Sequence, residues 1–258
     1  MFTKLKNLYS LFAEEQIIVY QMGKVGSSSI YKSLKSNGYN VIHAHHFGDH
    51  DIFSFYKNTD YFSYFYPRGE RIRHFISSKV KLYLLKKNKK VKIITCVRDL
   101  EKVLISRYMQ DLHLRFVSYH KKQITYKDLK VLTDEVINNI ESDINLDYFV
   151  NWFDVELKNN FGVDVYGIEY DANSGVGISF ETQKPLLVFN MSKVDADVLA
   201  SSLSHFIDSN CQIEITNSNV SSNKWYSEIQ RIVRNDYRIS ESYKKRIEES
   251  KLCKFFGL

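Results

Sequence analysis

The sequence contains few residues that interrupt or cross-link a chain. Its 258 residues include only two prolines, ten glycines and three cysteines. So few prolines and glycines argue against long flexible linkers, and a chain of this length can bury one complete core. We therefore expect residues 1–258 to form a single domain.

The cysteines are too few and too far apart for a disulfide framework or a metal site. Cys96, Cys211 and Cys253 have no metal-ligand spacing, and an odd number cannot all pair. Free thiols fit a reducing compartment. The apolar part of residues 1–15 is too short and interrupted for a signal sequence, and no run approaches the length of a membrane span. We expect a cytoplasmic protein without a transmembrane segment, and a peripheral position at the inner membrane face stays open.

Strong net charge is also lacking. The formal charge is +6, with 26% charged and 44% hydrophobic residues, which is typical of a soluble globular protein. An excess this small suits an anionic ligand but does not require nucleic acid, so no nucleic-acid partner is predicted.

Residues 16–36 contain the most informative pattern in the chain. Apolar residues at 17–20 predict a buried strand, Gly23 and Gly26 follow, and apolar residues at helical spacing begin after Ser27. A strand, a glycine turn and a helix N-terminus form a phosphate cradle, because free N–H groups and the helix dipole point at an anion. Lys24 would add a positive charge and the serines further donors. The alternative is an ordinary turn in which the glycines only reverse the chain.

This loop is not that of the nucleoside triphosphatases. Their motif, G-x-x-x-x-G-K-[ST], has lysine directly after the second glycine. Here Lys24 comes two residues before Gly26.

A second candidate anion site follows the clearest buried strand, at 91–97. Arg98 comes directly after this strand, and Ser106 lies eight residues further along a predicted helix. The guanidinium group suits a phosphate, since it carries a permanent charge and a fork of donors. The alternatives are a surface ion pair of Arg98 with Asp99 or Glu101, and a neutral helix position for Ser106.

Histidines gather in a predicted strand over residues 39–47. His43 and His45 alternate with Ala44, so their side chains share one face. An imidazole suits a general base at neutral pH. A metal site would need a third ligand such as His50 or Asp49, and we predict none. The remaining alternative is core packing, which we expect for at least one of His43 and His45.

Strands and helices alternate along most of the chain. Helices are predicted at 69–90, from 100, at 148–161, at 194–207 and from 224, and further strands at 163–166, 178–181 and 185–190. This order predicts a three-layer α/β fold with a mostly parallel central sheet, into which residues 112–147 form a helical insertion. The glycine loop, the histidines and Arg98 all follow strands, and ligands of such folds bind at the carboxyl ends of strands.

The order K-x-G-[ST]-[ST] at residues 24–28, and the strand followed by R-D-[PL] and a helix with serine, resemble sulfotransferases that use 3′-phosphoadenosine-5′-phosphosulfate (PAPS). Leu100 stands where proline is more usual. The resemblance implies a P-loop-type fold, PAPS as co-substrate and no metal. It further implies that Lys24 stabilises the bridging oxygen and that His45, or else His43, is the base. The loop residues implied to hold the 5′-phosphosulfate are Gly23, Lys24, Val25, Gly26, Ser27, Ser28 and Ser29, and those for the 3′-phosphate are Arg98 and Ser106.

The string NKWYS at residues 223–227 and the segment at 146–167 resemble a bacterial family known as "putative capsular polysaccharide synthesis protein", which is sulfotransferase-like. The likeness runs from about Ile17 to the C-terminus. It implies a saccharide hydroxyl as the acceptor. Lys224 either reaches the nucleotide phosphates or is simply a lysine at a helix N-terminus.

The leading hypothesis is thus a PAPS-dependent sulfotransferase of one sulfotransferase-like α/β domain. One alternative is a metal-dependent phosphotransferase, and another is a non-catalytic protein that binds a nucleotide or a glycan. For the latter, the basic stretch at 68–92 would offer a polyanion-binding face; otherwise it is a solvated helix surface. The sequence does not indicate an oligomeric state.

Overall fold

The computed structural model describes residues 11–12, 14–47, 52–57, 68–116, 125–208, 213–215 and 224–258. Among these residues, six strands form one sheet in the order β2–β1–β3–β6–β5–β4. The strands are β1 (Gln16–Tyr20), β2 (Val41–Ala44), β3 (Val91–Val97), β4 (Tyr170–Asp171), β5 (Val176–Ser179) and β6 (Leu186–Asn190). The first four in the sheet order are parallel, and β5 is antiparallel to both of its neighbours, β6 and β4. The predicted α/β class with a mostly parallel sheet is confirmed.

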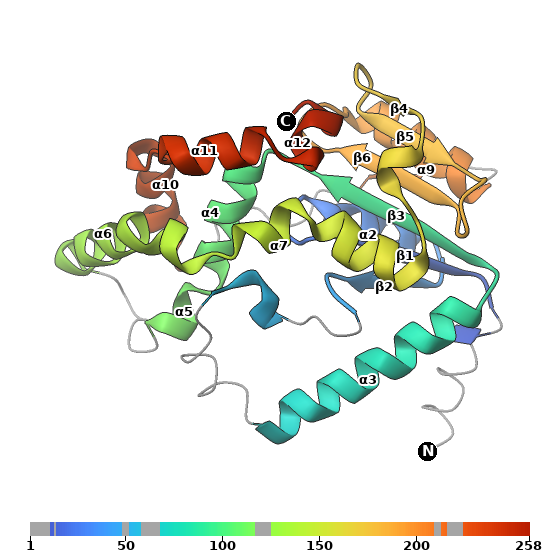
Figure 1. Cartoon of the computed structure of the whole chain (residues 1–258), viewed down its shortest axis with the longest axis horizontal. Helices are drawn as coiled ribbons and strands as arrows, with labels where there is room; N and C mark the ends of the chain where they lie inside the picture. The colour runs from blue at the N-terminus through green and yellow to red at the C-terminus, as the bar shows by residue number, and fades with distance from the viewer. Residues whose placement is uncertain are drawn as a thin grey trace.

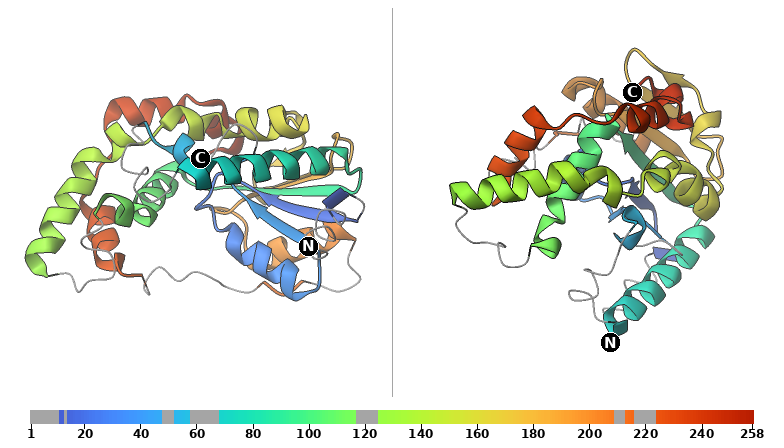
Figure 2. Two further views of the ribbon diagram at one scale, coloured as in Figure 1. Left: turned by 90° about the horizontal axis from the view of Figure 1, so that it is seen from below. Right: turned by 60° about the vertical axis from the view of Figure 1, so that its left-hand side comes forward.

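Helices cover both faces of this sheet (Figures 1 and 2). On one face lie α2 (Ser27–Ser36) and α9 (Ala196–Ile207). On the other lie α3 (Arg68–Lys87), α7 (Leu146–Val150), the π-helical segment η4 (Phe153–Lys158) and α8 (Asn159–Phe161). The remaining helices are η1 (Ile52–Phe55), α4 (Leu100–Gln110), α5 (Leu112–Arg115), α6 (Tyr126–Asp143), η5 (Val165–Gly167), α10 (Ser227–Asp236), α11 (Glu241–Glu248) and α12 (Lys251–Phe256).

The first β–α–β unit forms where the sequence predicts it. All five residues of β1 are buried, as expected for the interior of a parallel sheet. Helix α2 ends next to Gly38, whose φ of 84° is the left-handed conformation that glycine adopts without strain after a helix. The chain then returns as β2, which pairs in parallel with β1 from Ile17 opposite Val41 onward.

Two predicted elements differ in the structure. The strand expected at 163–166 is instead the short helix η5, because the Asp164 carboxylate accepts a hydrogen bond from Tyr166 N (3.1 Å) and closes a turn. The helix expected at 148–161 is divided into α7, η4 and α8, and it ends as predicted at Gly162.

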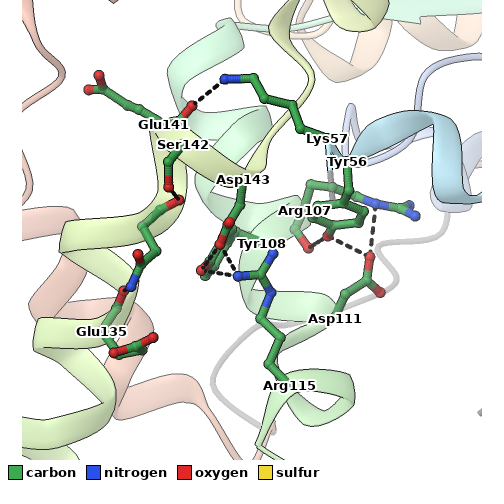
Figure 3. A network of polar contacts seen from close by, with 11 residues as sticks. Tyr56, Lys57, Arg107, Tyr108, Asp111, Arg115, Glu135, Glu141, Ser142 and Asp143 are labelled. Atoms are coloured by element: carbon green, nitrogen blue, oxygen red, sulfur yellow. Dashed lines mark hydrogen bonds and ion pairs between the residues drawn. The ribbon is translucent and has the colours of Figure 1, made fainter. Parts of the chain in front are cut away.

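Helices α4, α6 and α10 pack together beyond the carboxyl ends of the parallel strands (Figure 1). Helix α6 begins with a capping box, in which Thr125 and Asp128 exchange hydrogen bonds. Tyr108 of α4 and Arg115 of α5 both bind the Asp143 carboxylate at the end of α6 (Figure 3). These contacts fix α4 and α5 against α6, near the carboxyl ends of the strands.

A buried carboxylate joins the end of the first strand to the second half of the chain. Glu156 of η4 is fully buried and accepts hydrogen bonds from Tyr20 OH, Tyr148 OH (2.7 Å), Phe47 N (3.0 Å) and Asn160 Nδ2 (3.0 Å). Burial, and then the negative charge of Glu156, raise the pKa of Tyr20, so Tyr20 remains a donor. An ionised carboxylate accepts only, and four donors match it.

Among the described residues, no helix combines the length and the apolar character needed to cross a membrane. Cys96 and Cys253 are buried, free thiols. Cys211 lies outside the described residues.

We predict that Glu156→Gln lowers the free energy of unfolding by about 1–3 kcal/mol, because the amide NH₂ group would face donors and leave a buried polar group unsatisfied. Denaturant unfolding measures this loss. The exposed Glu135→Gln on α6 is the matched control and should change stability by less than about 0.5 kcal/mol. Equal stability of both variants would show that the Glu156 network does not hold the fold.

Candidate functional site

The loop between β1 and α2 has an unusual backbone. Gly23, Lys24 and Gly26 have φ values of 88°, 63° and 90°. Left-handed conformations cost little for glycine but are unfavourable for lysine, so Lys24 is held in place by its surroundings. Gly26 is the N-cap of α2 and has no side chain to cap the first N–H groups of the helix. Ser29 N donates to the carbonyl oxygen of Gly26 (3.3 Å), and a helix N-terminus without a side-chain cap is a favourable position for an anion.

This loop forms one wall of a cavity of about 670 Å³. Its described lining residues are Lys24, Val25, Gly26, Ser27, Ser28, Ser29, His45, Arg98, Ser106, Gln110, Met191, Lys224, Gln230 and Arg234. Nearly all residues singled out from the sequence thus lie around one space, although they come from four separate parts of the chain. Gly23 and His43 are not among the lining residues: Gly23 precedes Lys24 in the loop, and His43 Nε2 lies 3.0 Å from Ser27 Oγ.

Positive charge dominates the cavity. Lys24, Arg98, Lys224 and Arg234 line it, and no described lining residue is a carboxylate. Burial, followed by the charges of Lys224 and Arg107, lowers the pKa of Lys24 to about 8. The positive groups thus repel one another, and the binding of an anion among them would be favourable.

Gln21 links the loop to both histidines. Its Oε1 accepts a hydrogen bond from Gly23 N, which makes Nε2 the donor end of the side chain. Nε2 then lies 3.1 Å from His43 Nε2 and 2.8 Å from His45 Nδ1. A side chain that the sequence analysis did not single out therefore orients both imidazoles.

His45 faces the cavity with Lys24 and Arg98, as the base hypothesis requires. Its Nδ1 is also 3.1 Å from the carbonyl oxygen of Gln21. A proton on Nδ1 that is donated to this carbonyl leaves Nε2 as an acceptor, whereas acceptance from the Gln21 amide puts the proton on Nε2. Burial, followed by the charges of His43 and Arg107, lowers the pKa of His45 to about 3. The ring is neutral at pH 7 but weakly basic in the free site.

His43 has the more structural environment. Its ring stacks on Tyr31, with centroids 5.2 Å apart, and its Nε2 lies 3.0 Å from Ser27 Oγ. Burial lowers its pKa as well. His43 is half-buried, packs on Tyr31 and lies within hydrogen-bond distance of Ser27. His50 and Asp49, the alternative metal ligands, lie outside the described residues.

Arg98 lies at the end of β3 and turns into the cavity. The ion pair considered for it does not form among the described residues: Asp99 instead caps α4 through Lys102 N (3.2 Å) and pairs with the Lys102 side chain. Ser106 lies two turns further along α4 and lines the same cavity. The end of a buried strand predicted the position of Arg98, whereas Ser106 was singled out by the resemblance to sulfotransferases.

Four lining residues were missed. Gln110 is four residues after Ser106, and Gln230 and Arg234 are also four apart, so each pair shares a helix face. Met191 directly follows the buried strand β6. These spacings are visible in the sequence, but only the packing of α10 against α4 shows which face meets the cavity.

Arg107 is a further residue that was missed, and it lies beneath the loop. Its side chain is 4% exposed, its Nε is 3.1 Å from Asp111 Oδ2, and its guanidinium carbon is 4.2 Å from the centre of the Phe55 ring (Figure 3). Tyr56 OH donates to the same Asp111 oxygen (2.8 Å). A Cβ on Gly23 would lie 3.6 Å from Arg107 Nη1, so the loop approaches this cation closely.

The donor set suits a ligand with more than one negative charge. A helix N-terminus and Lys24 lie at one wall, and Arg98 and Ser106 belong to another strand end. Two anionic groups of one ligand can therefore be bound separately. Among the described residues, no group of three or more His, Cys, Asp or Glu side chains is arranged to hold a metal ion.

Comparison with known families covers the second half of the chain. The model of the NKWYS family, described as "Putative capsular polysaccharide synthesis protein", matches residues 122–257. The chain belongs to the NKWYS family. The match includes Met191, Lys224, Gln230 and Arg234 of the cavity, whereas the glycine loop, His45, Arg98 and Ser106 precede it. The chain matches neither a curated protein nor a solved structure.

We predict that Lys224→Gln raises the pKa of Lys24 above its value of about 8, because a neighbouring positive charge disfavours protonation. An NMR titration of the Lys24 side chain measures the change. Lys244→Gln on α11 removes an exposed lysine elsewhere and should leave the titration unchanged. An unaltered Lys24 titration in the Lys224 variant would contradict the described arrangement of the cavity.

Proposed function

We propose that this member of the NKWYS family is a sulfotransferase that moves a sulfuryl group from PAPS to a hydroxyl group of a saccharide. The family's association with capsular polysaccharide synthesis is the reason for choosing a saccharide acceptor. The observation that carries the proposal is the joint lining of one cationic cavity by the glycine loop and by Arg98 with Ser106.

The proposed binding mode assigns one anion to each wall. The backbone N–H groups at the start of α2, with Lys24 and the serines of the loop, hold the 5′-phosphosulfate. Arg98 and Ser106 hold the 3′-phosphate, for which a guanidinium fork and a hydroxyl are suitable donors. Lys224 and Arg234, which also line the cavity, add further positive charge.

The proposed transfer forms one bond and breaks one. The acceptor oxygen bonds to sulfur while the bond from sulfur to the 5′-phosphate oxygen breaks, and its electron pair stays on adenosine 3′,5′-bisphosphate. His45 Nε2 takes the proton of the acceptor hydroxyl, and Lys24 stabilises the charge that develops on the leaving oxygen. Gln21 acts as a positioning residue: its backbone carbonyl holds the His45 proton on Nδ1 when its side-chain amide donates to His43 Nε2 (3.1 Å) and not to His45.

One observation favours a second candidate, a protein that binds a nucleotide without catalysis. The pKa of about 3 makes His45 a poor base in the free site. A bound anion would raise this pKa, because it favours the protonated ring. The size of that rise distinguishes an enzyme from a binding protein.

The first test concerns the 3′-phosphate. We expect Arg98→Ala to weaken the binding of adenosine 3′,5′-bisphosphate at least about tenfold more than that of adenosine 5′-monophosphate, since a charged hydrogen bond contributes about 1.5–3 kcal/mol. Isothermal titration calorimetry measures both affinities. Arg231→Ala, an exposed residue of α10 paired with Glu228, is the control and should affect neither. An equal loss for the two nucleotides in Arg98→Ala would make Arg98 a structural residue.

The second test concerns His45. We expect adenosine 3′,5′-bisphosphate to raise its pKa from about 3 and to leave the proton of the neutral ring on Nδ1. Imidazole ¹⁵N shifts, followed over pH with and without the nucleotide, report both properties. A pKa that stays near 3 in the complex, or a proton on Nε2, would remove His45 as the base and favour the binding protein.

A further inference from the structure

Helix α3 exposes an apolar stripe along its outer side. Residues 72, 75, 76, 80 and 83 recur at the spacing of one helix face. They are Ile72, Phe75, Ile76, Val80 and Tyr83, and each side chain is between 43% and 62% exposed. Apolar residues exposed singly are common, but a contiguous row of five marks a surface that meets something else.

The body of the protein contacts the adjoining face of the same helix. Leu82 and Leu85 are buried: Leu82 comes seven residues after Phe75, at the edge of the stripe, and Leu85 lies about a further sixth of a turn away. Every residue from Gly69 to Ser77 is exposed, and α3 runs along the margin of the described fold (Figure 1). Arg71 contacts the fold, since its guanidinium carbon is 4.1 Å from the centre of the Phe53 ring. Among the described residues, the apolar surface of α3 is therefore covered on one side and exposed on the other, and the exposed side can take a further partner.

Positive charge surrounds the stripe. Helix α3 contains seven Lys and Arg residues and one acidic residue, Glu70. Lys79 lies over the Phe75 ring (5.3 Å) and Lys87 over the Tyr83 ring (5.9 Å), so their aliphatic stems run along apolar surface while their charges stay at its edge. Lys89 and Lys90 extend the positive region beyond the end of the helix and are exposed.

We propose that α3 binds the surface of an anionic lipid bilayer. Phe75, Ile76 and their neighbours would enter the boundary between headgroups and acyl chains, and the lysines and arginines would bind the anionic headgroups. A second copy of this chain is a poorer occupant, because it would bring an equally positive helix to the same place. This inference concerns a surface outside the nucleotide cavity, and it stands whether or not the proposed transfer occurs.

Vesicle sedimentation with the full chain tests this proposal. We expect binding to vesicles in which phosphatidylglycerol replaces part of the phosphatidylcholine, little binding to pure phosphatidylcholine, and a decrease with added salt. The double variant Phe75→Ser, Ile76→Ser should bind at least about tenfold more weakly, because two apolar side chains no longer leave water. The control Tyr126→Ser, Val131→Ser removes two exposed apolar residues of α6 and should bind within about twofold of the unaltered chain.

Variants that lose positive charge distinguish binding to anionic lipid from non-specific adsorption. Arg73→Gln, Lys86→Gln, Lys87→Gln together should also weaken binding at least about tenfold, whereas the matched triple Lys127→Gln, Lys130→Gln, Lys244→Gln should have a smaller effect. Circular dichroism checks that each variant is folded, which is expected for exposed positions.

Three results would overturn the proposal. The first is equal binding to neutral and anionic vesicles. The second is a dimer that the Phe75, Ile76 variant disrupts, with no vesicle binding, which would assign the stripe to a second copy. The third is binding of polyglutamate without binding of vesicles, which would assign it to an acidic protein.

Discussion

The structure depends on a buried carboxylate that holds the two halves of the chain together. Glu156 lies in the part matched by the NKWYS family and accepts hydrogen bonds from Tyr20, at the end of β1, and from the N–H of Phe47, after β2. Trp152, one turn earlier, donates to the carbonyl of His45 (3.0 Å). The glycine loop begins one residue after Tyr20. The position of the loop and of the histidines is therefore set by contacts from a distant segment. A buried carboxylate that accepts hydrogen bonds from several fixed donors favours one packing of the segments that provide them.

The cavity that results brings positive charges close together. Lys24 and His45 both have lowered pKa values, and in each case nearby positive charge adds to the effect of burial. Arg107 contributes to both, although it is paired with Asp111. An anion bound between Lys24, Arg98 and the start of α2 would reverse these effects. Binding of a ligand with several negative charges is therefore favoured, because the ligand relieves the repulsion among these positive groups.

Short-range rules were sufficient for the elements that line the cavity. A buried strand followed by glycines predicted the loop, and the strand before Arg98 predicted its place at the sheet edge. Tertiary packing decided the rest. Arg107 and Arg234 lie on helices whose orientation no local pattern fixes, and the apolar spacing of α3 predicted a helix without revealing that Phe75 and its neighbours face outward. The strand expected at 163–166 was wrong because the Asp164 side chain formed a turn instead.

The most direct test of the account is a calorimetric titration of the unaltered chain with adenosine 3′,5′-bisphosphate in the presence of a chelator, beside a titration with ATP and Mg²⁺. We predict binding of the bisphosphate that the chelator does not weaken, and weaker binding of the magnesium complex. The reason is that the cavity offers Lys24, Arg98, Lys224 and Arg234 and no carboxylate among its described lining residues. Tighter binding of ATP with Mg²⁺ would contradict this prediction.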